Sequence, residues 1–382
     1  MKRKASSVAV LTLFLFMNIL ISASNIQIIE AESSTIIVPD DYPTIKEAIE
    51  AASAGDTIIV SAGRYVEGQI TVYKPLSLIA EGFVVVWGTN ILYKSVFYVA
   101  SDNVTLKGFI IKRSHYGIGL GNVGWCVIEG NSITETYCGI WSRNLGDNNI
   151  IKENRITAYD DDAIQLMGPA SFNVIEGNEI LGKSTDPRFL CAIYLDYYFQ
   201  RNIIRDNTIV QGGGIFLNWH SSQNIVSDNR IAGNPIGMWD SDSNIIERNT
   251  VEDGWGSGIN LGDSNYNLIR ENTLRNITED PRPGVRTGSI MLYWGQNYKN
   301  TVEKNFIFEC HDGILIEESS HTNICDNVVL RCTGRGLAVT ASSNHTTIQK
   351  NVVLLNQQFD LYWDQTGDSN TWTNNRYQTK NW

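Results

Sequence analysis

The 382-residue chain carries a formal charge of −11 at neutral pH, from 41 acidic and 30 basic residues. A chain this acidic lacks the basic surface that nucleic acid requires, and it repels polyanions unless a divalent cation bridges them. Its ten tryptophans and sixteen tyrosines have to lie in a core or on a binding surface.

The N-terminus has the layout of a secretory signal. Three basic residues at positions 2–4 precede a mostly apolar run, Val8–Ile21, which is shorter than the roughly 20 residues of a spanning helix. Small residues follow, so residues 1–24 are predicted to be a signal peptide; an uncleaved N-terminal anchor is the alternative. No later stretch is apolar enough to span a bilayer. We therefore expect a secreted or cell-surface protein without a transmembrane span in the mature chain.

Residues 43–54 (PTIKEAIEAASA) form the one convincing helix pattern. Its spacing gives a single apolar face, made of Ile45, Ala48, Ile49 and Ala52. A helix here would cap a repeat array, because terminal repeats otherwise expose their apolar interior. A strand pattern (GDTIIV, 55–60) follows, and we expect one domain over residues 36–382.

A repeat of the form Asn-x-Ile-x-x-Asn-x-Ile dominates the rest of the chain. Clear copies occupy 149–156, 173–180, 202–209, 224–231, 244–251, 267–274 and 300–307. The second asparagine of each clear or weaker copy falls at 131, 154, 178, 207, 229, 249, 272, 305, 327, 351 and 375. A period of 20 to 24 residues fits a coil of three short strands, and it predicts about eleven coils.

Stacked coils place equivalent residues directly above one another. Asparagine suits such a column, because its amide bonds to its own copies and it tolerates a left-handed turn. The register predicts one internal apolar column, formed by Ile128, Ile151, Ile175, Ile204, Val226 and Ile246. We therefore interpret the asparagines as structural.

A second strand, of the form Gly-Ile-x-Leu, lies between the asparagine motifs, for example at 117–120, 214–217 and 258–261. Its Ile and Leu point inward and the residue between them points outward. The Ile and Val preference and the punctuating glycines argue against leucine-rich repeats, and no six-residue period indicates a left-handed helix. The prediction is an all-β, single-stranded, right-handed parallel β-helix with an N-terminal capping helix.

The six cysteines raise the question of disulfides in an exported protein. Cys310 and Cys332 are one period apart and are expected to be stacked neighbours, whereas the other four have no evident partner. Buried free thiols are the preferred interpretation for most of them, since no close Cys-x-x-Cys pair indicates zinc. Glycosylation sequons occur at Asn103, Asn276 and Asn344.

The stretch VPDDYPTIKEAIEAASAGDTIIVSAGRYVE (38–67), with the repeats after it, resembles the pectin-lyase-like β-helix superfamily, and within it the NosD-like, carbohydrate-binding and sugar-hydrolase group. The resemblance covers nearly the whole mature chain and implies export. It implies no single activity, because members include lyases, hydrolases, epimerases and proteins without known chemistry. Asp161–Ile164 resembles the paired-Asp strand of β-helix polygalacturonases, but the companion motifs are missing. Five dispersed histidines do not make a copper site.

Outward residues of the Gly-Ile-x-Leu strands form the candidate glycan-binding face. One row is Trp141, Gln165, Tyr194 and Phe216, and a second is Arg143, Met167, Asp196, Asn218 and Trp239, with Trp219, His220 and Asp240 just beyond. Aromatic rings stack on sugars while amides, carboxylates and arginine bond hydroxyls. The alternative is that insertions cover this surface and make it a secondary core.

Two long coils carry insertions, at 182–190 and at 276–288. Both precede a Gly-Ile-x-Leu strand and so emerge on one edge of the candidate face. They are expected to wall a groove over the coils of Phe216, Trp239 and Trp255, because long loops on a solenoid usually build its binding site.

The candidate catalytic carboxylates are Asp160, Asp161, Asp162, Asp196 and Asp240. Asp196 and Asp240 are two coils apart, about 10 Å between backbones, which suits an inverting hydrolase pair. A lyase would instead need a base, for which His220 is a candidate, and a charge neutraliser such as Arg143 with carboxylate-held calcium. Taken alone, each acid fits a solvated turn residue better than a catalytic one, and His220 is open to the same two interpretations.

These observations support two functions of different classes. One is an exported β-helix protein that binds, and as an enzyme would cleave or modify, a polysaccharide or surface glycan. The other is a non-catalytic cell-surface or adhesive protein whose regular stack is itself the function. The oligomeric state does not follow from the sequence.

Overall fold

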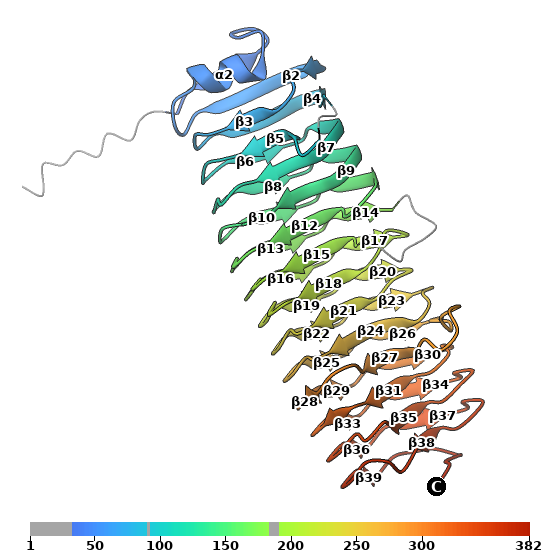
Figure 1. The fold of residues 1–382 in the computed structure, drawn as a ribbon. Coiled ribbons are helices and arrows are strands. Elements are labelled where there is room, and N and C mark those ends of the chain that lie inside the picture. Colours follow the sequence, from blue (N-terminus) through green and yellow to red (C-terminus); the bar gives the residue numbers. More distant parts are fainter. Residues whose placement is uncertain (1–32, 90–91, 183–190) are drawn as a thin grey trace, which may run out of the picture.

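The computed structural model describes residues 33–89, 92–182 and 191–382. The predicted signal peptide and nearly all of the insertion at 182–190 lie outside the described residues. The described chain forms an elongated rod of stacked turns, with the helix α2 (Ile45–Ala51) at one end and residue 382 at the other (Figure 1). The rod has about 14 turns. The asparagine repeats predicted about eleven, because the first turns lack the repeated asparagine.

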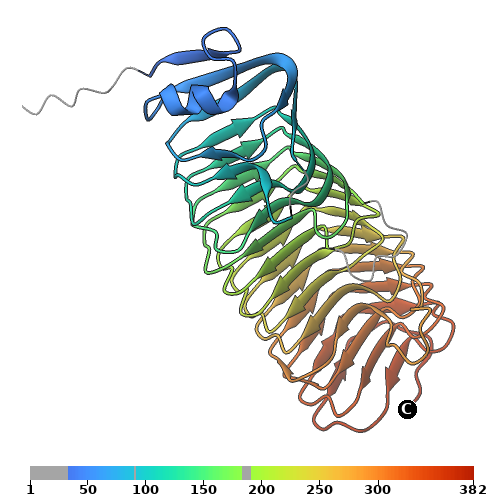
Figure 2. The ribbon, with the colours of Figure 1, turned by 45° about the horizontal axis from the view of Figure 1, so that its top comes forward.

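Each turn contributes to three parallel sheets that run the length of the rod (Figure 2). The first sheet contains the strands that begin at the first asparagine of each repeat. Its members are β1 (Thr35–Val38), the N-terminal parts of β2 (Thr57–Val66) and β4 (Ser77–Trp87), β6 (Thr105–Lys107), β8 (Val127–Glu129), β10 (Ile150–Lys152), β13 (Val174–Glu176), β16 (Ile203–Arg205), β19 (Ile225–Ser227), β22 (Ile245–Glu247), β25 (Leu268–Arg270), β29 (Thr301–Glu303), β33 (Asn323–Cys325), β36 (Thr347–Gln349) and β39 (Thr371–Thr373).

The second sheet follows the second asparagine of each repeat. It takes the C-terminal parts of β2 and β4, the N-terminal parts of β7 (Ile110–Leu120) and β9 (Ser132–Ser142), and then β11 (Arg155–Tyr159), β14 (Glu179–Leu181), β17 (Thr208–Val210), β20 (Arg230–Ala232), β23 (Thr250–Glu252), β26 (Thr273–Arg275), β30 (Phe306–Phe308), β34 (Val328–Leu330) and β37 (Val352–Leu354).

The third sheet is built from the Gly-Ile-x-Leu strands and carries the candidate face. It contains β3 (Ile70–Val72), β5 (Ser95–Val99), the ends of β7 and β9, β12 (Ile164–Met167), β15 (Ile193–Asp196), β18 (Ile215–Asn218), β21 (Ile236–Trp239), β24 (Ser257–Gly262), β27 (Gly288–Leu292), β31 (Ile314–Glu317), β35 (Leu337–Thr340) and β38 (Leu361–Trp363). Two short strands at a turn, β28 (Asn297–Tyr298) and β32 (Ser319–Ser320), pair separately.

The predicted internal column is confirmed. Successive strands pair in register at each of its positions, and every side chain is buried: Ile128, Ile151, Ile175, Ile204, Val226 and Ile246. The inward residues of all three sheets join one apolar cluster that runs along the rod. The capping helix adds Ile45, Ala48 and Ile49 to this cluster, and the Thr44 side chain accepts a hydrogen bond from the Glu47 N–H at its N-terminus.

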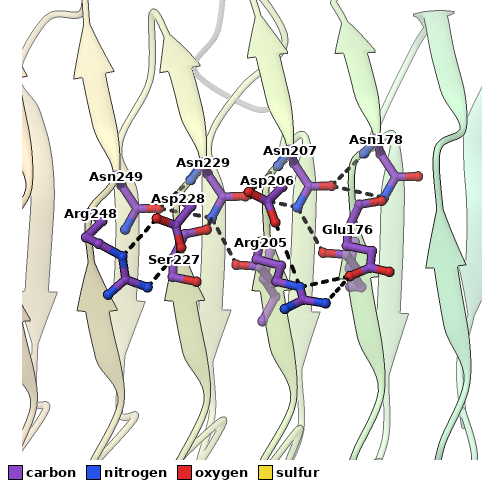
Figure 3. A network of polar contacts seen from close by, with 12 residues as sticks. Glu176, Asn178, Arg205, Asp206, Asn207, Ser227, Asp228, Asn229, Arg248 and Asn249 are labelled. Atoms are coloured by element: carbon purple, nitrogen blue, oxygen red, sulfur yellow. Dashed lines mark hydrogen bonds and ion pairs between the residues drawn. The ribbon is translucent and has the colours of Figure 1, made fainter.

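The asparagines form a buried hydrogen-bonded ladder (Figure 3). Asn207 is typical: its Oδ1 accepts from both the backbone N–H and the side-chain amide of Asn178, each at 3.0 Å. Its own Nδ2 donates to the carbonyl of Ile175 at 3.0 Å and to Oδ1 of Asn229 at 2.9 Å. The amide thus satisfies backbone groups at a turn that is buried from solvent.

One part of the asparagine prediction is wrong. The ladder asparagines do not take the left-handed conformation; the residue before each of them does, for example Glu153, Asp206 and Arg248 with φ of 55°, 55° and 54°. Because these exposed residues turn outward, they also carry ion pairs between turns, such as the 2.9 Å contact from Arg248 Nε to Asp228 Oδ1 (Figure 3). Exposed pairs of this kind contribute about 0–1 kcal/mol each.

All six cysteines are free thiols, and five of them are buried. Cys310 and Cys332 lie on consecutive turns, where the Thr333 N–H donates to the carbonyl of Cys310. Burial raises the pKa of the Cys332 thiol to about 12. These thiols are therefore protonated packing groups rather than nucleophiles or metal ligands.

Candidate functional site

The third sheet lines up the outward residues in the predicted order. Gln165 pairs with Trp141 on one side and with Tyr194 on the other, and Tyr194 pairs with Phe216. The row continues through Gly237 and Asn260 to Met291. At about 4.8 Å per turn, the seven turns from Trp141 to Met291 span about 30 Å.

Two neighbouring pairs of residues in the second predicted row are also paired between successive strands. Met167 pairs with Asp196, and Asn218 pairs with Trp239. Arg143 directly follows β9 at the start of this row and is exposed.

Two aromatic rings pack closely against glycines of the next turn. A Cβ on Gly237 would come within 2.6 Å of the Phe216 ring, and a Cβ on Gly262 would come within 2.7 Å of the Trp239 ring. Any larger residue at these two positions would clash with the ring, so glycine permits this approach. Farther along the face, Trp141 stacks on Tyr116 with ring centres 4.5 Å apart and planes 5° apart.

Asp162 is held inside the turn. Its Oδ1 accepts from the Cys191 N–H at 2.8 Å and its Oδ2 accepts from the Gln165 amide at 2.9 Å. Burial, followed by the charge of Asp161, raises the pKa of Asp162 to about 7. Asp312, at the equivalent position of a later turn, likewise accepts from the N–H of Arg335 on the next turn. Asp162 therefore has a structural role that this fold repeats elsewhere.

Asp161 lies beside a cluster of rings at the edge of the third sheet. Burial raises its pKa, while the Tyr137 hydroxyl and the charge of His115 oppose that rise. His115 stacks on Tyr137 with ring centres 4.5 Å apart, and burial lowers the pKa of the His115 imidazole. Asp160 is exposed.

Asp196 and Asp240 are not joined by any contact within the described residues. Asp196 is buried, and it accepts from the Tyr194 hydroxyl at 3.1 Å and from the Tyr197 N–H at 3.0 Å. Burial raises the pKa of Asp196. Asp240 is partly exposed, with Oδ1 3.4 Å from His220 Nδ1, and the His220 ring packs against Tyr198. Asp240 and His220 form a carboxylate–imidazole pair that solvent reaches.

The insertion at 276–288 walls the face, as the sequence predicts. A cavity of about 200 Å³ lies beneath it, lined by Asp280, Arg282, Val285 and Arg286 from the insertion and by Phe216, Asn234, Pro235, Trp255, Gly256, Ser257, Asn260, Met291 and Tyr293 from the coils. A second cavity of about 390 Å³ shares Phe216, Asn260 and Tyr293 with the first. It extends along Asn218, Trp219, Met238, Trp239 and Trp294. The two cavities form one groove, which we call the aromatic groove.

The sequence prediction missed several residues of the aromatic groove. Trp294 packs edge-on against Trp239 with ring centres 5.4 Å apart, and Tyr293 lies between the two cavities. Asn260 continues the column of Phe216 two turns later, and Tyr293 directly follows β27. Continuing the predicted row past Phe216 and Gly237 by one further period reaches Asn260, and this is the signal that could have found it.

No group of three or more His, Cys, Asp or Glu residues in the described ranges is placed to hold a metal ion. The calcium that a lyase would use therefore has no preformed cluster in that part of the chain. Among the same residues, no helix is long and apolar enough to cross a membrane.

The family model for a right-handed β-helix region matches residues 95–239, 211–286 and 236–377. The chain belongs to the right-handed β-helix family. The matched residues run from β5 onward and include the aromatic groove, and the match agrees with the resemblance seen in the sequence.

Solved β-helix structures share the fold at low sequence identity. A variant of a GH87 α-1,3-glucanase catalytic domain, in complex with nigerose, matches with a TM-score of 0.59 and 13% identity, over 91% of this chain and 69% of that one. The tailspike protein of E. coli bacteriophage HK620, in complex with a pentasaccharide, gives 0.58 and 11%, over 86% and 73%. A mannuronic acid specific family 6 polysaccharide lyase from human gut microbiota gives 0.51 and 14%, over 90% and 83%.

A sequence relative is described as a cell surface glycoprotein of Methanothermus fervidus. It is 26% identical over 379 residues, which is 95% of this chain. The chain spans only 56% of the length of that relative.

Proposed function

We propose that this β-helix protein is exported and binds an extracellular polysaccharide along the outward face of its third sheet. The observation that carries the proposal is the aromatic groove, in which rings packed against glycines lie beside amides, with the insertion at 276–288 as a wall. Aromatic rings stack on the apolar faces of sugars, and amides bond sugar hydroxyls. The basic and apolar N-terminal segment supports export.

Solved structures of the same fold that hold a saccharide support the proposed class of ligand and nothing finer. The glucanase and tailspike structures hold nigerose and a pentasaccharide. At 13% and 11% identity they share the fold with this chain, so the ligand class is proposed from the groove itself.

Two alanine variants test binding. One removes an aromatic residue inside the groove, and the other removes a residue of the same type outside it. Phe216→Ala removes a ring that lines both cavities, and Phe306→Ala removes a partly exposed ring from the second sheet. On an array of neutral and acidic glycans, Phe216→Ala should weaken binding by about tenfold, the scale of about 1.4 kcal/mol for a lost aromatic contact. Phe306→Ala should leave binding unchanged. Equal effects of the two variants, or no retention of any glycan by the wild type, would refute the proposal.

The more specific part of the proposal is that the protein cleaves the glycan that it binds. Among the candidate acids, Asp240 has both solvent access and an imidazole partner, whereas Asp162 and Asp196 are buried and hydrogen-bonded. We propose Asp240 and His220 as the pair that would exchange protons with a bound glycan. Asp240→Asn should retain binding and abolish the release of reducing ends; Asp196→Asn and Asp162→Asn should reduce stability first. Unchanged product release from Asp240→Asn would exclude the pair.

A second function, a non-catalytic structural role at the cell surface, is favoured by the relative from Methanothermus fervidus. The regular ladder would then be the functional feature and the groove a by-product of packing. Absence of both glycan retention and product release, in a folded wild-type protein, would favour this alternative.

A further inference from the structure

We propose that the cavity under residues 276–288 is a subsite that selects a neutral sugar unit over a uronate or sulfated unit. The inference rests on the proposed glycan-binding function and adds the substrate class. Its volume of about 200 Å³ equals the liquid volume of about seven waters, at about 30 Å³ each, which is the scale of a single sugar ring. The aromatic residues Phe216, Trp255 and Tyr293 line it.

The first arginine of the cavity is committed to a carboxylate. Arg282 donates from Nε to Oδ1 of Asp280 at 2.9 Å and from Nη2 to Oδ2 at 2.7 Å. The Asp280 side chain is only 2% exposed, and the guanidinium lies 5.4 Å from the ring centre of Trp255. Arg282 and its hydrogen bonds lower the pKa of Asp280, so this carboxylate stays charged and neutralises the arginine.

The second arginine makes a single, longer ion contact and is itself more than half exposed. Arg286 Nη1 lies 3.3 Å from Oε1 of Glu317, whose side chain is 8% exposed. The Thr340 hydroxyl donates to the same oxygen at 3.0 Å. Asp280, Arg282 and Arg286 line the cavity, and Glu317 contacts Arg286 from outside the lining, so the two pairs together have a formal charge of zero. The other polar residues that line the cavity are the uncharged Asn234, Ser257 and Asn260, with the hydroxyl of Tyr293.

Such a balanced lining recognises hydroxyls better than anions. A hydroxyl both donates and accepts, so it can bond a carboxylate and a guanidinium without breaking either ion pair. A sugar carboxylate would have to displace Asp280 or Glu317 from its arginine, or lose its hydration next to them. The chain as a whole, at −11, also repels polyanions.

The cavity is preorganised by the path of the insertion. The Asp280 N–H donates to the Thr287 hydroxyl at 3.1 Å, which joins the start and the end of the loop. Trp255 forms a backbone bridge to Thr278. Gly256, with φ of +79°, allows Asp280 Oδ2 to approach within 3.2 Å of the place where a Cβ would stand. A ligand that enters the cavity therefore meets arginines whose charge is already paired with a carboxylate. This pairing is what selects a neutral sugar over an acidic one.

The test compares neutral and carboxylated tetrasaccharides that share linkage, such as α-1,4-linked galactose and galacturonate oligomers, across a panel of linkages by calorimetry. The wild type should bind the neutral member of a matched pair more tightly by about tenfold or more, the scale of one charge-assisted hydrogen bond. Asp280→Asn and Glu317→Gln each leave an arginine without its carboxylate, and each should shift the ratio toward the acidic member by about tenfold. Asp228→Asn, which makes the same charge change on an exposed ion pair outside the cavity, should leave the ratio unchanged.

The outcomes separate this inference from the proposed function. Retention of glycan that Phe216→Ala weakens, with a ratio that neither Asp280→Asn nor Glu317→Gln moves, would overturn the selectivity inference alone. Tighter binding of the acidic member by the wild type would overturn it as well. No binding of any glycan would overturn both. If Asp280→Asn fails to fold, Glu317→Gln decides the outcome by the same criterion.

Discussion

The asparagine ladder makes a quantitative prediction for Asn207→Ala. The substitution deletes four hydrogen bonds: two accepted from Asn178, one donated to the Ile175 carbonyl and one donated to Asn229. The Asn229 oxygen retains the backbone N–H of residue 207 as a partner, and the Asn178 amide retains the Ile151 carbonyl. The Asn178 N–H loses its acceptor in a site that is 1% exposed.

The expected cost follows from these groups. A buried hydrogen bond contributes about 1 kcal/mol net, and a buried donor left without a partner costs about 1–3 kcal/mol. With two bonds partly replaced, Asn207→Ala should lower the free energy of unfolding by about 3–4 kcal/mol. Urea unfolding followed by tryptophan fluorescence measures this loss. Amide hydrogen exchange should rise first in the turns of residues 178 and 229, because each turn contacts only its neighbours.

A surface variant provides the control. Arg205→Ala removes exposed ion pairs to Glu176 and Asp206 beside the same rung (Figure 3) and should cost about 0–1 kcal/mol. A loss below 1 kcal/mol for Asn207→Ala, or equal losses for the two variants, would show that the ladder is not a principal source of stability.

Three further predictions concern the groove, a buried acid and the cap. Trp239→Ala should weaken glycan binding by about tenfold in calorimetry, because the stacking contact that it removes contributes about 1.4 kcal/mol. An unchanged affinity would contradict the proposed role of the groove. Burial raises the pKa of Asp162 from 3.8 to about 7, so the folded state holds this proton more tightly and loses stability as pH rises from about 4 to about 7. Asp162→Asn should flatten the pH dependence of the free energy of unfolding, measured by urea titration. An unaltered pH dependence would contradict this prediction. Deleting residues 36–54 uncovers the apolar end of the rod. We therefore expect aggregation, measured by light scattering, or loss of cooperative thermal unfolding. Unchanged melting would show that the helix is dispensable.

Much of the fold followed from the repeat alone. In a parallel solenoid, residues one period apart lie directly above each other, so the spacing of Asn154, Asn178 and Asn207 predicted both the ladder and the column of Ile151, Ile175 and Ile204. The same rule placed Trp141, Gln165, Tyr194 and Phe216 in one row. The repeat therefore predicted which equivalent residues meet between successive turns from residue 131 onward, but not in the first turns, which lack the repeated asparagine.

Contacts between non-equivalent positions depended on the tertiary structure. Three features depend on how turns bend and which side chains fill the space beside them: the burial of Asp162 and Asp196, the pairing of Asp240 with His220, and the packing of aromatic rings against Gly237 and Gly262. The path of residues 276–288 placed Asp280 and Arg282 over the face and brought Arg286 to Glu317 of β31. A period says which residues are stacked, because stacking is a translation by one turn. It does not say where a loop returns or how a side chain is desolvated, because those depend on packing across turns and sheets.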